Sequence, residues 1–216
     1  MRAIAAGQRP LLAGYDRLVT DAVVLAYPEP IVPVTVVRST VLLSSVAALR
    51  EAGHYDLYLA ALPREFHEPL LESVVGMWLP LAVATAHYRA CDSLVLSADS
   101  QAKLGRAVFD RTKGTLLGTA VRLAQNAGVT PWTVFPYFQR FWLRGYDGGG
   151  IRVTRVGPKE ALIEVVSVGL LDVPYYRSAL RGLLTGVIAL FCRQAYVHER
   201  PGGRRSGEAT YRAQWA

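Results

Sequence analysis

The sequence predicts an α+β fold in which a helical N-terminal part packs on a small antiparallel sheet. Apolar residues recur at helical spacing over much of residues 39–143, whereas apolar and polar residues alternate from 151 to 168 and again from 208 to 215. The chain has 216 residues, of which 51% are hydrophobic and 19% charged. This composition excludes an intrinsically disordered chain and provides enough apolar surface for one sizeable core.

The first 33 residues are predicted to form an N-terminal arm. Apolar patches alternate there with Pro10, Pro28, Pro30 and Pro33, which oppose a continuous helix or a central strand. The remaining residues, 34–216, are expected to form a single α+β domain.

The helical part begins after a short β-branched strand at 34–37. Helices are expected at about 39–50 and 65–75, from Leu81 onward after a break at 77–80, and at 100–127, with Gly128 as the stop. A further helix is predicted from Thr130 to Leu143, because Thr130 suits the N-cap and Pro131 the first turn.

The sheet is predicted from segments with a two-residue period. Residues 151–156 and 161–168 flank a Gly-Pro-Lys turn and form a hairpin. A helix at about 175–192 follows, and short strands at 194–198 and 208–215 form a C-terminal strand pair. Gly182 and Gly186 on that helix favour close approach of another element.

The formal net charge is +7, but the basic residues are spread along the chain, so specific recognition of nucleic acid is not expected. Cys91 and Cys192 are too few for a disulfide framework and are predicted to be buried free thiols. No apolar run is long enough to span a membrane, and no signal-like segment opens the chain. We therefore expect a soluble, cytoplasmic protein.

Aromatic residues are concentrated in the segment 132–142. They would cover more than one helix face, which indicates an aromatic-lined pocket, a partner surface, or two layers of core. A pocket between this helix and the hairpin sheet would bind a small hydrophobic molecule. The predicted ligand-binding residues are Trp132, Phe135, Phe138 and Trp142 of this segment, together with Tyr175 and Tyr176 at the start of the next helix, which only the family resemblance described below implies.

His87 lies on an apolar helix four residues before Cys91, so the two side chains share one helix face. Three interpretations are open: a satisfied core histidine, an axial haem ligand, or a ligand of another metal. A zinc site would need further ligands, which no nearby residue supplies, so no metal site is predicted. No carboxylate pair, nucleophile elbow or phosphate-binding loop is found, and an enzyme is not favoured.

Four short motifs occur in an order known from other proteins: residues 78–81 (Trp-Leu-Pro-Leu), residues 104–106 (Leu-Gly-Arg), the strand 150–156 followed by Gly-Pro, and the closing Trp215. In this order the chain resembles a family of uncharacterised myxobacterial proteins. That family is distantly similar to the haem-nitric-oxide-binding (H-NOX), vinyl-reductase and TRAPP-subunit group of folds. The resemblance implies helices on a small antiparallel sheet, and either binding of a small hydrophobic or ring-shaped molecule or pairing of subunits. The haem-binding relatives hold the haem propionates with a Tyr-x-Ser-x-Arg motif, which this chain lacks.

Three functional hypotheses follow. The first is a non-enzymatic small-molecule-binding or sensor domain with an aromatic-lined pocket, forming a homodimer. The second is a haem-binding gas or redox sensor with His87 as the axial ligand. The third is a protein-protein interaction or scaffold module that uses the aromatic helix.

Overall fold

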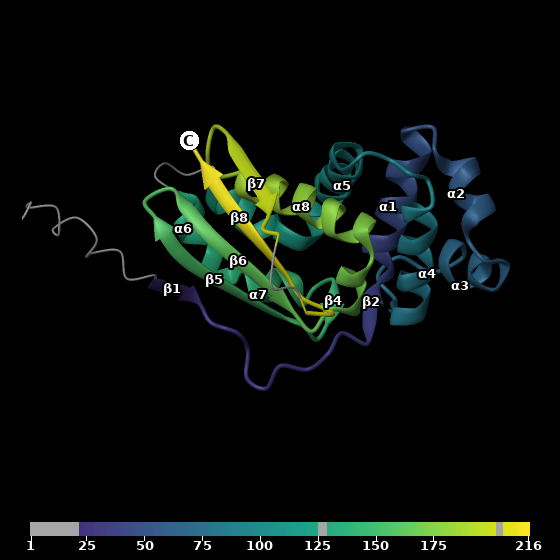
Figure 1. Ribbon diagram of the computed structural model, residues 1–216, viewed down its shortest axis with the longest axis horizontal. Helices are drawn as coiled ribbons and strands as arrows, with labels where there is room; N and C mark the ends of the chain where they lie inside the picture. Colours follow the sequence, from purple (N-terminus) through teal and green to yellow (C-terminus); the bar gives the residue numbers. More distant parts are fainter. Residues whose placement is uncertain (1–21, 125–128, 202–204) are drawn as a thin grey trace, which may run out of the picture.

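The computed structural model describes residues 22–124, 129–201 and 205–216, with side chains except those of 115–124. The first 21 residues of the predicted arm lie outside this part. The fold is α+β, as predicted. The larger of its two sheets has five strands. Figure 1 shows this sheet towards one end of the molecule and helices α1 to α4 towards the other, with α5 and α8 between them.

The larger sheet is antiparallel and contains the predicted hairpin and the C-terminal strand pair. Its strands, in spatial order, are β1 (Ala22–Leu25), β5 (Gly150–Gly157), β6 (Glu160–Val166), β8 (Ala209–Trp215) and β7 (Ala195–Glu199). The alternation that predicts these strands is visible in burial, because Ala161, Ile163 and Val165 of β6 are buried while the residues between them are half-exposed. The described part of the arm joins the sheet, since β1 pairs with β5.

A second, three-stranded sheet lies where the helical part meets the rest of the domain. It consists of β3 (Trp78–Pro80), β2 (Val36–Arg38) and β4 (Tyr146–Asp147) in that order. The segment expected to be only a break before a helix is therefore a strand. Pro80 fits there because it ends an edge strand and immediately precedes the next helix.

The helical part consists of four helices, α1 (Ser39–Glu51), α2 (Tyr55–Ala61), α3 (His67–Leu71) and α4 (Leu81–Asp92). The helix predicted over 65–75 is shorter, since a 3-10 turn at Arg64–Phe66 leads into α3, which ends at Leu71. Pro69 explains the discontinuity, because it has no N–H to donate to the carbonyl of Glu65 four residues earlier.

Helices α5 (Ala98–Ala124) and α8 (Pro174–Ile188) form the most extensive helix pair of the fold, and glycine makes their close approach possible. A Cβ at Gly105 would clash with the backbone of Ala179, and one at Gly182 would clash with the backbone of Ala102. The predicted small-residue pattern on α8 thus corresponds to a close backbone contact.

The aromatic segment is not one helix, contrary to the prediction for 130–143. It comprises α6 (Pro131–Val134), a 3-10 turn (Phe135–Tyr137) and α7 (Phe138–Trp142). Pro136 causes the break, because it cannot donate to the carbonyl of Trp132 and it restricts the residue before it. The start of the segment is as predicted, with Thr130 and Thr133 in a capping box.

Candidate functional site

His87 lies at the centre of a buried polar cluster formed by α1, α2 and α4. Its Nδ1 atom is 2.8 Å from the hydroxyl oxygen of Tyr58, and its Nε2 atom is 3.0 Å from Oγ of Ser45. Sγ of Cys91 lies 3.8 Å from the same Nε2 atom. In a neutral imidazole one ring nitrogen donates a hydrogen bond and the other accepts one. Here each ring nitrogen has a hydroxyl partner, so both are engaged.

Burial keeps this cluster uncharged. It lowers the pKa of His87 to about 3, and it raises the pKa of the Tyr58 hydroxyl and of the Cys91 thiol well above their usual values. Since imidazole binds a metal through a free lone pair, His87 in this arrangement is a satisfied core histidine. Among the described residues, no group of three or more His, Cys, Asp or Glu side chains could hold a metal ion.

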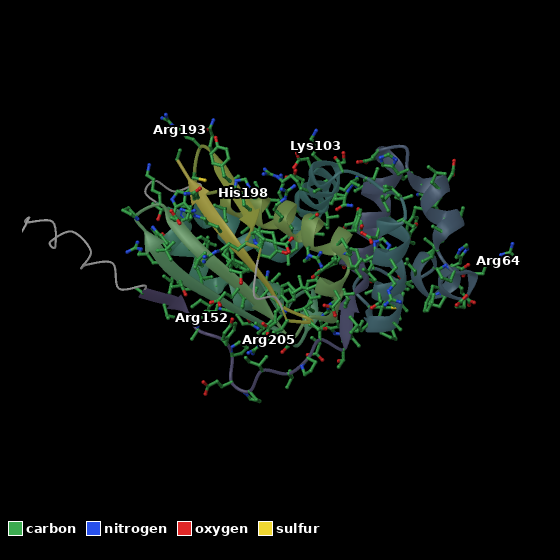
Figure 2. All side chains as sticks on the ribbon, viewed as in Figure 1. Arg64, Lys103, Arg152, Arg193, His198 and Arg205 are labelled. Atoms are coloured by element: carbon green, nitrogen blue, oxygen red, sulfur yellow. The ribbon has the colours of Figure 1, made fainter. Side chains whose placement is uncertain are left out.

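The other histidines lie apart from this cluster. His67 Nε2 is 2.9 Å from the carbonyl oxygen of Leu62, and His54 precedes α2. His198 is exposed on β7, and Figure 2 shows it at the sheet end of the molecule. The basic side chains labelled in Figure 2, including Arg64, Lys103 and Arg193, are scattered over both ends of the molecule. This distribution agrees with the expectation of dispersed positive charge.

An apolar cavity of about 70 Å³ lies between α1, α5, α7, α8 and the sheet strands β5 and β6. Apart from Thr112 and Tyr146, its walls are glycine, aliphatic or aromatic. The lining residues are Val41, Val108, Phe109, Thr112, Phe138, Phe141, Trp142, Gly145, Tyr146, Ile151, Val165, Leu180, Leu183, Leu184 and Val187.

The aromatic wall of this cavity is held in place by hydrogen bonds to the loop before β5. Trp142 Nε1 donates to the carbonyl of Gly148 at 2.8 Å, and its ring stacks on Tyr146 with centroids 4.1 Å apart. The Gln139 side chain donates to the carbonyl of Gly149 and accepts from the amide of Ile151. These contacts fix α7 against β5 and leave Trp142 no free polar atom.

Four of the six predicted ligand-binding residues are brought together. Phe138 and Trp142 line the apolar cavity, while Tyr175 and Tyr176 line a smaller cavity beside it. The other two, Trp132 and Phe135, pack with Trp215, whose ring centroid is 4.8 Å from that of Trp132 and 5.7 Å from that of Phe135. These three rings form a separate aromatic cluster at the C-terminal end of β8.

Sequence reasoning did not single out Tyr88, Tyr146 and Tyr58. Tyr88 and Tyr146 come from α4 and β4 and meet Tyr176 of α8 at the smaller cavity. Tyr58 of α2 reaches His87 across 29 residues of chain. No local pattern marks such residues, because their proximity depends on how distant elements pack.

The two cysteines differ. Both are free, but Cys91 is fully buried beside His87, whereas Cys192 is half-exposed. The prediction of a buried thiol is therefore right for Cys91 and wrong for Cys192. Cys192 follows the end of α8 and bonds to the carbonyls of Ile188 and Gln194, so part of it faces outward.

The residues around the apolar cavity do not fit haem. Among the residues that the structure describes, no histidine, cysteine or methionine lines it, and no Lys or Arg lines it that could pair with the propionates. Thr112 Oγ1 already donates to the carbonyl of Val108 at 2.8 Å. The cavity is also far below the roughly 300–1,000 Å³ of ordinary cofactor and ligand sites. His87, the predicted axial ligand, has both ring nitrogens engaged elsewhere.

A scan of protein-family models found no match to this chain, and a search of curated proteins also found none. The solved structures it resembles are H-NOX domains. One is an unliganded Fe(II) H-NOX mutant from K. algicida, with a TM-score of 0.59 and 8% identity, covering 83% of this chain and 96% of that one. Another is an oxygen-binding H-NOX domain related to soluble guanylate cyclases, with a TM-score of 0.52 and 14% identity, covering 82% of this chain and 94% of that one.

A third similar structure, a Cs H-NOX variant, has a TM-score of 0.56 and 14% identity and covers 82% of this chain and 96% of that one. At these identities the likeness concerns the fold alone. The chain thus has an H-NOX-like fold, as the resemblance implied, whereas its membership of a myxobacterial family and its likeness to TRAPP subunits stay predictions. No helix within the described ranges is long and apolar enough to cross a membrane.

Proposed function

We propose that this protein is a non-enzymatic small-molecule-binding or sensor module that takes up a small apolar molecule directly, without haem. The observation that carries this proposal is the void of about 70 Å³ with almost entirely apolar walls at the centre of the domain. Protein interiors are otherwise close-packed, and an apolar void stays dry and accepts apolar guests.

The size of the void limits the guest. A lysozyme cavity of about 150 Å³ binds benzene or xenon, and the present cavity is about half as large. A diatomic gas, xenon or a molecule of a few heavy atoms would fit, whereas a ring-shaped ligand would require the walls to move. Two lining residues, Phe141 and Leu183, are only half-buried and are the first candidates for such movement.

Xenon is a direct probe of the cavity because it recognises apolar space and nothing else. We expect xenon to perturb the amide resonances of α7, α8 and β6 saturably. Leu184→Phe, which places a ring in the cavity, should abolish this effect, whereas Leu57→Phe on the exposed surface of α2 should not. Wild-type protein that shows no saturable xenon effect would refute the proposal.

A haem sensor is the second candidate, and the similar solved structures favour it over a haem-free function, since one of them is described as an oxygen-binding H-NOX domain. The residues of the cavity argue against it. Titration with haem, followed by absorption spectroscopy of wild type and His87→Ala, distinguishes the two. A Soret band that shifts in His87→Ala would support haem binding through His87, and the absence of such a band would support the haem-free proposal.

The homodimer and the interaction module remain predictions. In the aromatic segment Trp142 is buried, while Tyr137 and Leu143 are the large apolar residues with about half of their surface exposed. Light scattering of wild type against Leu143→Glu tests a dimer through this segment, because a charge in such an interface would leave only monomer.

A further inference from the structure

An open groove lies on the helical part of the molecule, between α4 and the segment that joins α2 to α3. It measures about 560 Å³, which falls within the roughly 300–1,000 Å³ of ordinary ligand sites. It shares no lining residue with the two cavities at the centre of the domain. Figure 1 shows these helices at the end of the molecule away from the larger sheet, so the groove is a separate site.

The floor of the groove is one face of α4. Ala82, Ala86 and Ala90 recur every four residues, so they lie in a row along the helix, and their methyl groups are too short to fill the space above them. The chain leaves α2 in an extended conformation at Pro63, with φ −58° and ψ 139°. This connection supplies the opposite wall, formed by Pro63 and Phe66, and leaves the groove open above the alanine row.

Arg89 is the one charged side chain among the described residues that line the groove. It is exposed, and within the described ranges its guanidinium makes no ion pair. Arg152, Arg181 and Arg212 each pair with a carboxylate of this chain. The aliphatic part of an arginine can lie along an apolar surface while its head group stays in water, and the planar head group suits a carboxylate.

A ligand with an apolar chain and one anionic end matches both features. Its chain would lose contact with water on the alanine row and against Phe66, which is favourable. Its carboxylate would meet Arg89 at an exposed position, where it keeps part of its hydration and avoids the cost of full burial. A cationic amphiphile would be repelled by the same guanidinium.

We propose that this groove binds a linear monocarboxylate, with the carboxylate at Arg89 and the alkyl chain along α4 towards Leu81. Ala82 precedes Arg89 by seven residues, which corresponds to about 10 Å along the helix and suits an extended chain better than a compact ring. The inference goes beyond the proposed function, since it concerns a different ligand at a different place.

Three amphiphiles test the inference by amide-resonance titration, each below the concentration at which it forms micelles. Decanoate has the chain and the carboxylate, hexanoate has a shorter chain, and decyltrimethylammonium has the opposite charge. We expect decanoate to bind saturably and to shift resonances of α4 and of residues 61–66. Affinity should fall about twofold to fourfold for each CH₂ removed on going to hexanoate, and decyltrimethylammonium should not bind.

Two substitutions separate the charge from the apolar floor. Arg89→Gln should weaken decanoate about threefold to tenfold. Its matched control is Arg64→Gln, because Arg64 is exposed at the same end of the molecule but does not line the groove, as Figure 2 shows for its position, and it should leave decanoate binding unchanged. Ala82→Phe places a ring over the floor from an exposed helix position and should weaken decanoate at least about tenfold.

Equal binding of decanoate by wild type and Arg89→Gln would overturn the inference, as would an equal loss in Arg64→Gln. Binding of decyltrimethylammonium as tight as that of decanoate would overturn it too, because the groove would then recognise apolar chains alone. Decanoate shifts that do not saturate, or that centre on α7 and α8, have the same consequence. A saturable xenon effect without decanoate binding would overturn this inference and leave the proposed function standing, and decanoate binding without a xenon effect would do the reverse.

Discussion

Two neighbouring regions of the interior are packed in opposite ways. Around His87 the space is filled and both ring nitrogens are paired, with Tyr58 and Ser45 as partners. At the adjoining cavities, between α1, α5, α7, α8 and the larger sheet, space is left unfilled. The comparison teaches that the histidine, which is the more conspicuous residue in the sequence, has a structural role, whereas the unfilled space lies among less conspicuous aliphatic and aromatic residues.

Both regions exclude charge, and this is what they share. His87 is neutral because burial lowers its pKa to about 3, and the described residues of the cavity walls include no ionisable side chain apart from tyrosine. The difference between the two regions therefore lies in packing. The four predictions below test that difference, in order of decreasing effect.

The largest effect is expected for His87→Ala. The substitution removes a fully buried ring and leaves Tyr58 and Ser45 without their partner, so the free energy of unfolding should fall by about 3–5 kcal/mol. Chemical denaturation measures it, with His198→Ala on the exposed face of β7 as a control that should change stability little. A loss below about 1 kcal/mol would show that the cluster is not structural.

The next effect is a dependence of stability on pH. Because the pKa of folded His87 is about 3 and that of the unfolded chain about 6.5, the unfolded state binds an additional proton between these values. The stabilisation that comes from keeping His87 neutral in the folded state is therefore complete above about pH 6.5 and is lost as the pH falls. The free energy of unfolding should decrease by about 2 kcal/mol between pH 7 and pH 5. Denaturation curves at several pH values should show this loss in wild type. His87→Gln should reduce it, and an identical pH dependence in both proteins would contradict the pKa.

A smaller effect distinguishes two Tyr→Phe substitutions directly. Tyr58→Phe leaves a buried nitrogen of His87 unpaired and should cost about 1–2 kcal/mol, whereas Tyr137→Phe removes a hydroxyl from an exposed side chain and should change stability by less than about 0.5 kcal/mol. Urea denaturation of both variants measures the difference. Equal losses would mean that the hydrogen bond between Tyr58 and His87 does not stabilise the folded protein.

The smallest effect concerns packing. Leu184→Phe extends a side chain into the cavity and should leave stability unchanged or raise it by up to about 1 kcal/mol, whereas Leu70→Phe in filled core should lower it. Thermal unfolding compares the two. A larger loss for Leu184→Phe than for Leu70→Phe would show that the cavity does not accommodate added volume.

Much of the fold could be predicted because its signals are local. The alternation in β6 and β8 follows from a sheet with one buried face, and the turn at Gly157-Pro158 joins the hairpin. Even the break in the aromatic segment has a local cause, which is Pro136. The prediction of one helix over 130–143 was wrong because it relied on the spacing of apolar residues and gave no weight to this proline.

The candidate site could be predicted only in part. Phe138 and Trp142, which line the apolar cavity, were predicted because aromatic residues are dense in segment 132–142, but the same argument selected Trp132 and Phe135, which pack against Trp215. Tyr175 and Tyr176 were predicted from the family resemblance, and they line the smaller cavity. Density of aromatic residues does not tell a filled core from a cavity wall. That distinction depends on which side chains arrive from the opposite element.

The sequence alone determined the α+β class, the hairpin and the capping box at Thr130, since each depends on residues near one another in the chain. Only the tertiary structure decided that His87 meets Tyr58 and Ser45, that α5 and α8 approach at Gly105 and Gly182, and that an apolar cavity is left between α7, α8 and the larger sheet. The physical reason is that pairing and packing are satisfied between elements distant in sequence. Whether space between such elements is filled is decided only when all of them have been placed.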